Sequence, residues 1–204
     1  MYIARTPAIA RALYGSRLWR VAAEDAGKSL YLTFDDGPIP EVTPWVLEQL
    51  RPYNAKATFF CIGKNIEAHP DVFAQVKAAG HSIGNHTWDH CNGRHTTLTD
   101  YLTSVQRCQP LTGTDLFRPP YGRLTREQAN ALGADFRIVM WSVLSGDFDV
   151  RIDAERCTRN VLKHAGPGSI VVFHDSVKAW PRMKVSLPKV LEHFAGSGYD
   201  FKAL

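Results

Sequence analysis

From residue 29 onward the chain alternates short apolar segments with amphipathic ones, and this alternation limits the possible folds more than any other feature of the sequence. The expected strands, about seven of them, are 29–34, 56–63, 81–85, 116–118, 136–143, 168–174 and 199–204. They are apolar on both faces, as is typical of parallel strands that helices cover on both sides.

Amphipathic segments between these strands predict helices. Thr43 as N-cap and Pro44 at the first helical position predict a helix that runs to Leu50. Further helices are expected at 70–80, where Gly80 ends the helix, and at 98–111, 125–133, 153–166 and 187–198. A closed barrel and an open doubly wound sheet both fit this order of elements. No G-x-G-x-x-G follows the first strand, so a dinucleotide-binding fold loses its main support.

Length and composition indicate a single soluble domain. The 204 residues are expected to form one domain, 1–204, with 1–28 as an N-terminal extension packed on it. Apolar residues make up 45% and charged residues 22%, which is ordinary for a globular protein. The net charge of +4 is too small to indicate a nucleic-acid partner, and we expect a monomer.

The sequence contains no transmembrane segment, since no stretch approaches the roughly 18 apolar residues that a span requires. The arginine-containing N-terminus also lacks the continuous apolar region of a secretory signal. As written, the chain is therefore expected in the cytoplasm. An incomplete N-terminus would instead make an extracytoplasmic location the expectation.

Polar side chains follow the expected strands at their carboxyl ends, which is where chemistry is located in both candidate architectures. The clusters are Asp35 and Asp36 after the first strand, His86 and His90 after the third, Arg118 after the fourth, Asp147 after the fifth, and His174 after the sixth. Because the carboxyl ends of parallel strands meet at one edge, we expect these side chains to lie close together.

Each cluster alone has an ordinary explanation. Asp35 and Asp36, followed by Gly37, fit a turn with both carboxylates in water, and H-x-x-x-H is a common surface pair. Together, however, one aspartate and two histidines at a single rim indicate a 2-His-1-carboxylate metal site with open coordination positions. Such a site explains why two adjacent carboxylates are tolerated, because one binds the metal and the other stays free as a base.

Four motifs in this order, TFDDGP, HTWDH, RPPYG and VFH, resemble those of the polysaccharide deacetylases, the NodB-homology domain of carbohydrate esterase family 4. The resemblance covers roughly residues 29 to 204. It implies an α/β fold, a distorted (β/α)7 barrel with parallel strands and the active site at the carboxyl ends of the strands.

The resemblance also implies roles by matching position. Asp35 would be the general base and His174 the general acid. The ligands of a divalent ion, with Zn²⁺ expected first and Co²⁺ or Ni²⁺ as alternatives, would be Asp36, His86 and His90. Arg118 would orient Asp35, Asp147 would pair with His174, and the backbone N–H of Tyr121 would help to hold the oxyanion.

Aromatic side chains near the same rim are candidates for contact with sugar rings, and they are Trp88, Tyr121 and Trp180. The alternative for Trp88 is that it packs inward. The chain departs from the family pattern in WSVLSGDFD, where Leu144 replaces an aspartate and Phe148 replaces a tryptophan. Val172 stands where the family usually has leucine. We expect these changes to leave the core mechanism intact and to alter the shape and polarity of the sugar pocket.

These residues are compatible with three functions to different degrees. The favoured one is a metal-dependent hydrolase that removes acetyl groups from N-acetylated sugars of a chitin-like polymer or peptidoglycan. The second is an O-acetyl esterase acting on acetylxylan or another O-acetylated glycan. The third, a glycan-binding module without catalysis, is disfavoured because a binder has no use for both a base and an acid.

Overall fold

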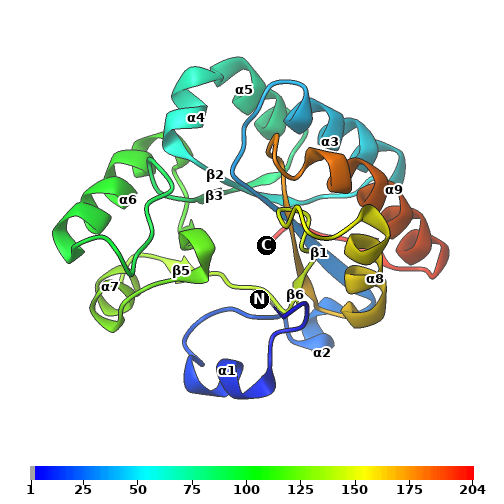
Figure 1. The fold of residues 1–204 in the computed structure, drawn as a ribbon, viewed down its shortest axis with the longest axis horizontal. Helices are drawn as coiled ribbons and strands as arrows, with labels where there is room; N and C mark the ends of the chain where they lie inside the picture. Colours follow the sequence, from blue (N-terminus) through cyan, green and yellow to red (C-terminus); the bar gives the residue numbers. More distant parts are fainter. Residues whose placement is uncertain (1–2) are drawn as a thin grey trace.

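The computed structural model describes residues 3–204, and these residues form a curled parallel sheet with helices around its outside (Figure 1). The strands are β1 (Ser29–Asp35), β2 (Thr58–Cys61), β3 (Ser82–Asn85), β4 (Leu116–Phe117), β5 (Arg137–Ile138), β6 (Val143–Leu144), β7 (Ile170–His174) and β8 (Asp200–Phe201). Their order is β5-β4-β3-β2-β1-β7-β6, and β8 pairs with β1. All the strand pairs are parallel, so the predicted α/β fold, a distorted barrel, is confirmed.

Helices connect most of the successive strands and cover the outer face of the sheet (Figure 1). They are α1 (Ala8–Leu13), α2 (Ala23–Ala26), α3 (Val42–Leu50), α4 (Gly63–Ala68), α5 (Pro70–Ala78), α6 (Leu98–Thr112), α7 (Arg126–Leu132), α8 (Ala154–His164) and α9 (Trp180–Gly196). The predicted start of the last helix was wrong, because α9 begins at Trp180 and continues through Pro188. The N-cap prediction was also wrong, since Thr43 lies inside α3 after Glu41.

The apolar segment predicted as one strand, 136–143, is divided between the two edges of the sheet. Its first part is β5, which pairs with β4, and its last part enters β6, which pairs with β7. The same stretch of chain therefore crosses the seam between the sheet edges, and the prediction of a single strand was wrong. Local sequence cannot distinguish the two arrangements, because both bury an extended apolar segment.

The N-terminal segment supplies backbone partners to the chain that crosses this seam. Met140 N–H donates to the Leu18 carbonyl at 2.8 Å, and Leu18 N–H donates to the Ile138 carbonyl at 2.9 Å. Leu144 N–H donates to the Ala4 carbonyl at 2.8 Å. These bonds satisfy polar groups that have no neighbouring strand within the sheet itself.

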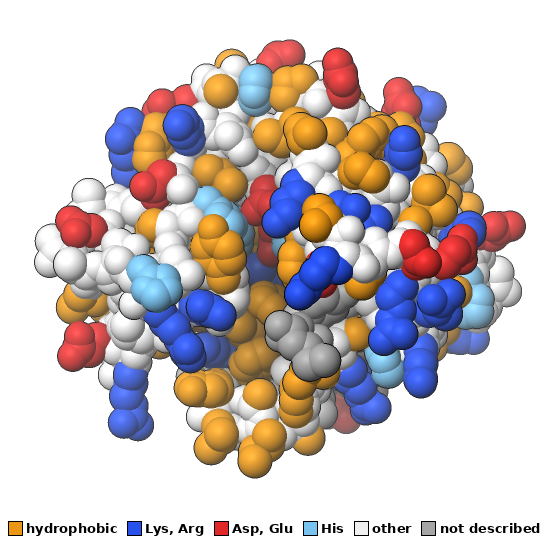
Figure 2. All heavy atoms as spheres, viewed as in Figure 1, with side chains coloured by type: hydrophobic (Ala, Val, Ile, Leu, Met, Phe, Trp, Pro, Cys, Tyr) orange, Lys and Arg blue, Asp and Glu red, His pale blue; other side chains and the backbone are white. Residues whose placement is uncertain are grey.

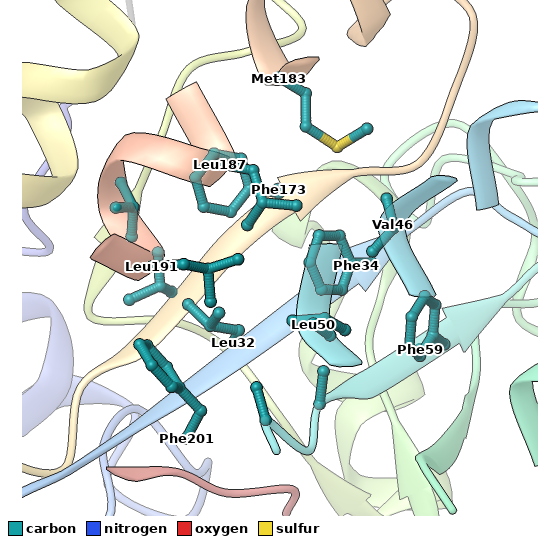
Figure 3. Close-up of a cluster of buried hydrophobic side chains, with 14 of the residues drawn as sticks. Leu32, Phe34, Val46, Leu50, Phe59, Phe173, Met183, Leu187, Leu191 and Phe201 are labelled. Carbon is teal, nitrogen blue, oxygen red and sulfur yellow. The ribbon is translucent and has the colours of Figure 1, made fainter. Parts of the chain in front are cut away.

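The main hydrophobic core lies between the outer face of the sheet and helices α3 and α9 (Figure 3). Phe34 on β1 stacks against Phe59 on β2 and Phe173 on β7, with ring centroids 5.0 and 6.1 Å away. All seven residues of β1 are buried, because helices cover one face and the barrel interior covers the other. Because the central strands are buried, the polar side chains at their carboxyl ends are held at defined positions along the rim of the barrel.

No helix in the described part of the chain combines the length and apolar character needed to cross a membrane.

Replacing Phe34 by alanine should lower the free energy of unfolding by about 3–5 kcal/mol, because the cavity forms where three aromatic rings meet. Urea denaturation would measure the change. Leu98→Ala is the control, since Leu98 is 38% exposed at the start of α6 and should change stability by about 0.5 kcal/mol or less. Equal losses in the two variants would contradict the position of the core.

Candidate active site

Asp35, the last residue of β1, forms a buried ion pair with Arg118, which directly follows β4. Arg118 Nη1 lies 2.6 Å from Asp35 Oδ1, and the arginine side chain has no exposed surface. The same nitrogen donates to Thr33 Oγ1 at 2.7 Å. Nη2 and Nε donate to the carbonyls of Met140 and Val139 at 3.0 and 3.3 Å. The guanidinium is therefore held rigidly and keeps the Asp35 carboxylate in a defined orientation.

Asp36 faces two histidines in the loop after β3. Asp36 Oδ1 lies 3.3 Å from His90 Nε2 and 3.8 Å from His86 Nε2. The loop is not helical, and positive φ angles at Thr87 and His90 bend it so that both imidazoles face the carboxylate. The structure thus brings the three predicted ligands together.

These three side chains fit a divalent ion. Their ligand atoms all lie within 4.8 Å of one another, close enough for small side-chain movements to bring all three to Zn–N and Zn–O bonds of about 2.0–2.2 Å. Asp36 Oδ1 is buried and accepts no well-formed hydrogen bond from the described residues. A buried carboxylate oxygen without a donor is costly in a protein interior, and a cation would satisfy it.

The protonation state of His86 also suits a metal. Burial lowers the pKa of His86 to about 4, so its imidazole is neutral at pH 7. His86 Nδ1 lies 2.7 Å from the Arg118 carbonyl, so we assign it the proton, which leaves the Nε2 lone pair facing Asp36. Burial raises the pKa of Asp36, but the close approach of the His90 imidazole and the charges of His174 and His86 outweigh it and hold that pKa well below its usual range.

His174, the last residue of β7, forms a second pair with the buried carboxylate of Asp147. His174 Nδ1 lies 2.7 Å from Asp147 Oδ1, and the His174 backbone N–H donates to Asp147 Oδ2 at 2.7 Å. Burial alone would lower the pKa of His174, but the Asp147 carboxylate outweighs it and raises that pKa to about 9. In this environment the imidazole is protonated at pH 7 and can donate a proton from Nε2.

A cavity of about 620 Å³ connects these groups at the carboxyl ends of the strands. The face drawn in Figure 2 is hollowed near its centre, with acidic and histidine side chains at the hollow. The predicted residues that line the cavity are Asp35, Asp36, His86, His90, Tyr121 and His174. Tyr121 lies in the turn Pro120–Gly122 with a left-handed backbone, and its ring centroid is 4.6 Å from that of His90.

Two predicted sugar-contacting residues lie outside this cavity lining. The Trp88 ring packs under the Arg107 guanidinium at 3.6 Å, close to Gly63 at the start of α4. Trp180 begins α9 and packs edge-on against Trp45, with centroids 4.8 Å apart. Each indole is thus engaged by another element, and the structure does not bring either one to the base and the acid.

Several residues of the site had no role assigned from the sequence. Trp141 lines the cavity, as do Leu144 and Phe148, which were expected only to alter the pocket. The Phe148 ring meets His174 edge-on at 5.2 Å. Asp175, directly after the predicted acid, is fully buried, and burial raises its pKa to about 8. The position of Asp175 at a strand end, next to His174, could have indicated from the sequence that it belongs to the site.

Residues 22–136 match the family model described as polysaccharide deacetylase, which covers more than half of the chain. The chain belongs to the polysaccharide deacetylase family. The resemblance seen in the motifs is confirmed, and the positions of the catalytic motifs at one rim agree with it. The catalytic and ligand roles of individual residues stay predictions.

Members of this family from several bacteria are similar to the chain. A peptidoglycan-N-acetylglucosamine deacetylase of Bacillus cereus is 34% identical over 181 residues, which are 85% of this chain and 66% of that protein. A chitooligosaccharide deacetylase of Azorhizobium caulinodans is 41% identical over 156 residues, 72% of this chain and 73% of that protein. The chain thus spans just under two thirds of the Bacillus relative.

A solved structure of the deacetylase family supports the fold over almost the full length. The crystal structure of a peptidoglycan N-acetylglucosamine deacetylase, in complex with 4-naphthalen-1-yl-N-oxidanyl-benzamide, superposes with a TM-score of 0.85 at 31% identity. The match covers 98% of this chain and 95% of that chain. The curled parallel sheet is therefore the fold of this family.

Arg118→Met should destabilise the protein by about 3–5 kcal/mol, because it leaves the Asp35 carboxylate buried without its cation. The double variant Arg118→Met/Asp35→Leu removes both charges and should recover part of that loss. Chemical denaturation of the two variants and the parent, without added metal, would measure the coupling. A double variant no more stable than the single one would contradict the ion pair as the dominant interaction of Arg118.

Proposed function

We propose that the protein is a metal-dependent N-deacetylase of polysaccharides, hydrolysing the acetamido group of N-acetylated sugars in peptidoglycan or a chitin-like polymer. The observation that carries this proposal is the cluster of Asp36, His86 and His90 in one cavity, together with the carboxyl group of Asp35 and the imidazolium of His174. This arrangement supplies a metal site, a base and an acid, which are the groups that amide hydrolysis requires.

The side chains divide the chemistry between them. When bound by Asp36, His86 and His90, a divalent ion would supply Lewis acidity toward water and the acetyl oxygen. Asp35 accepts the proton of the attacking water, and Arg118 holds that carboxylate in its orientation. His174 donates its Nε2 proton to the departing nitrogen, because an amine leaves poorly unless it is protonated. The Tyr121 N–H, at the cavity edge, would stabilise negative charge on the acetyl oxygen.

The walls of the cavity suit a sugar carrying an acetyl group. Trp141, Leu144, Phe148 and Val172 are apolar parts of the lining, and Phe148 contacts His174, so the cavity fits an acetyl methyl group and a pyranose face. Arg123 and Lys178 also line the cavity, so an anionic glycan is electrostatically acceptable. Relatives named as peptidoglycan and chitooligosaccharide deacetylases support N-acetylated sugars over acetylxylan as the substrate class. That the chain acts as a monomer stays a prediction.

Acetate release should be highest with N-acetylated substrates. The assay compares chitooligosaccharides, peptidoglycan and acetylxylan, each after treatment with a chelator and after addition of Zn²⁺ or Co²⁺. We expect chelation to abolish release and either ion to restore it. His86→Ala is the matched variant and should lose the metal, since two remaining protein ligands make a poor site. Full metal occupancy in that variant, or preference for acetylxylan, would contradict the proposal.

His174→Ala should reduce turnover of amide substrates by about 10²–10⁴-fold, the usual contribution of a general acid. Activated aryl esters should be affected far less, because their leaving group needs no proton. Parallel kinetics on an N-acetylated chitooligosaccharide and an aryl acetate would measure the difference. Equal losses on both substrates would assign His174 to positioning or metal binding instead of proton donation.

Asp147→Asn should shift the alkaline limb of the amide pH–rate profile to lower pH. The Asp147 carboxylate raises the pKa of His174, so its removal lets the imidazole lose its proton, and its activity as an acid, at a lower pH. A bound cation lowers the pKa of His174 in the parent and in the variant alike. The quantity to measure is therefore the difference in the alkaline limb between these two proteins. Metal content should stay unchanged. An unshifted alkaline limb would show that Asp147 does not control the pKa of the general acid.

A further inference from the structure

The backbone at Asp36 adopts a conformation that residues with a Cβ rarely use, with φ at 87°. In a continuing strand, Asp35 and Asp36 would point to opposite faces. The left-handed turn ends the strand and lets both carboxylates line one cavity, Asp35 toward Arg118 and Asp36 toward the histidines. An unfavourable backbone conformation persists only where surrounding contacts hold it.

Two side chains hold the peptide group that follows Asp36. Asn65 Nδ2, from α4, donates a 2.7 Å hydrogen bond to the Asp36 carbonyl oxygen. The Gly37 N–H belongs to the same peptide group and donates to Asp175 Oδ1 at 3.0 Å. A peptide group is planar, so contacts at its oxygen and at its nitrogen together fix the orientation of the plane. That orientation sets ψ of Asp36 and with it the direction of the Asp36 side chain.

Asp175 is itself held in place from the other side. Its second oxygen, Oδ2, accepts a 2.6 Å hydrogen bond from the Thr43 hydroxyl, and the Thr43 oxygen accepts from the Ile39 N–H at 2.8 Å. The approach to Gly37 is close enough that a Cβ there would lie 2.0 Å from Asp175 Oδ2. The contact thus requires glycine at 37 and a buried acceptor at 175.

We propose that Asn65 and Asp175 are positioning residues that orient the Asp36–Gly37 peptide group and thereby preset the Asp36 carboxylate for metal binding. Neither belongs to the ligand triad, and neither lines the cavity. The inference rests on the proposed function only through the metal that Asp36 would bind. Groups that orient metal ligands typically change metal affinity by about 10–100-fold when they are removed.

Asn65→Leu tests the proposal, because leucine keeps the approximate shape of asparagine and removes the donor. Glu67→Gln is the matched control, an exposed polar change on the same helix. The affinity of the metal-free protein for Zn²⁺ is measured by competition with a chromophoric chelator, and the Co²⁺ absorption spectrum reports ligand geometry. We expect Asn65→Leu to bind Zn²⁺ about 10–100-fold more weakly with an altered Co²⁺ spectrum, and Glu67→Gln to match the parent.

Two further variants keep the test informative. Asn65→Ser lacks the reach of the amide and should give the same loss if Asn65→Leu does not fold. Asp175→Asn retains one acceptor for the Gly37 N–H, so it should weaken Zn²⁺ binding less than Asn65→Leu does. Zn²⁺ affinity within twofold of the parent in a folded Asn65 variant would overturn the proposal.

Hydrogen exchange at the Gly37 amide, measured without metal, separates this inference from the proposed function. The positioning contacts predict slow exchange in the parent and faster exchange in Asn65→Leu, because the peptide plane loses one of its two restraints. Should the parent bind no Zn²⁺ while exchange still rises in the variant, the metal-dependent function fails and the positioning role stands. Unchanged exchange in the variant would overturn the positioning role.

Discussion

The buried ion pair between Arg118 and Asp35 is the interaction on which the rest of the site depends. A guanidinium without solvent must find acceptors inside the protein, and Arg118 finds them on Asp35, Thr33 and the carbonyls of residues 139 and 140. These acceptors lie on β1 and on the chain that crosses the seam of the sheet. One side chain after β4 thus joins three parts of the barrel. Its own carbonyl contacts His86, so the base and one candidate metal ligand are positioned by the same residue.

Environment gives two histidines of one cavity opposite protonation states. Burial lowers the pKa of His86 to about 4 against the opposing effect of Asp35 and Asp36, whereas for His174 the Asp147 carboxylate outweighs burial and raises the pKa to about 9. A neutral imidazole can donate a lone pair to a metal, and an imidazolium can donate a proton. The two roles proposed for these histidines therefore follow from the partner at Nδ1, which is a backbone carbonyl for His86 and a carboxylate for His174.

Much of the fold was predictable because parallel strands have a strong local signature. Strands buried on both faces are apolar throughout, and polar residues at their ends must meet at one rim. The division of 136–143 between two sheet edges was not predictable in this way. It depends on how far the sheet curls and on hydrogen bonds from residues 4–18, which are distant in sequence. The same limit explains the early start of α9, where packing overrides the local pattern around Pro188.

Charged residues of the site were placed better by sequence reasoning than aromatic ones, and the reason is energetic. A buried carboxylate or guanidinium needs a partner of opposite charge or a hydrogen bond, so polar groups at the ends of neighbouring strands have few alternatives to one another. An indole is satisfied equally well by a cavity wall or by a neighbouring helix. Trp88 therefore packs under Arg107 and Trp180 against Trp45, while Trp141, on the chain crossing the seam, lines the cavity. Only the tertiary arrangement decides among such positions, because nothing in the chemistry of the ring requires one of them.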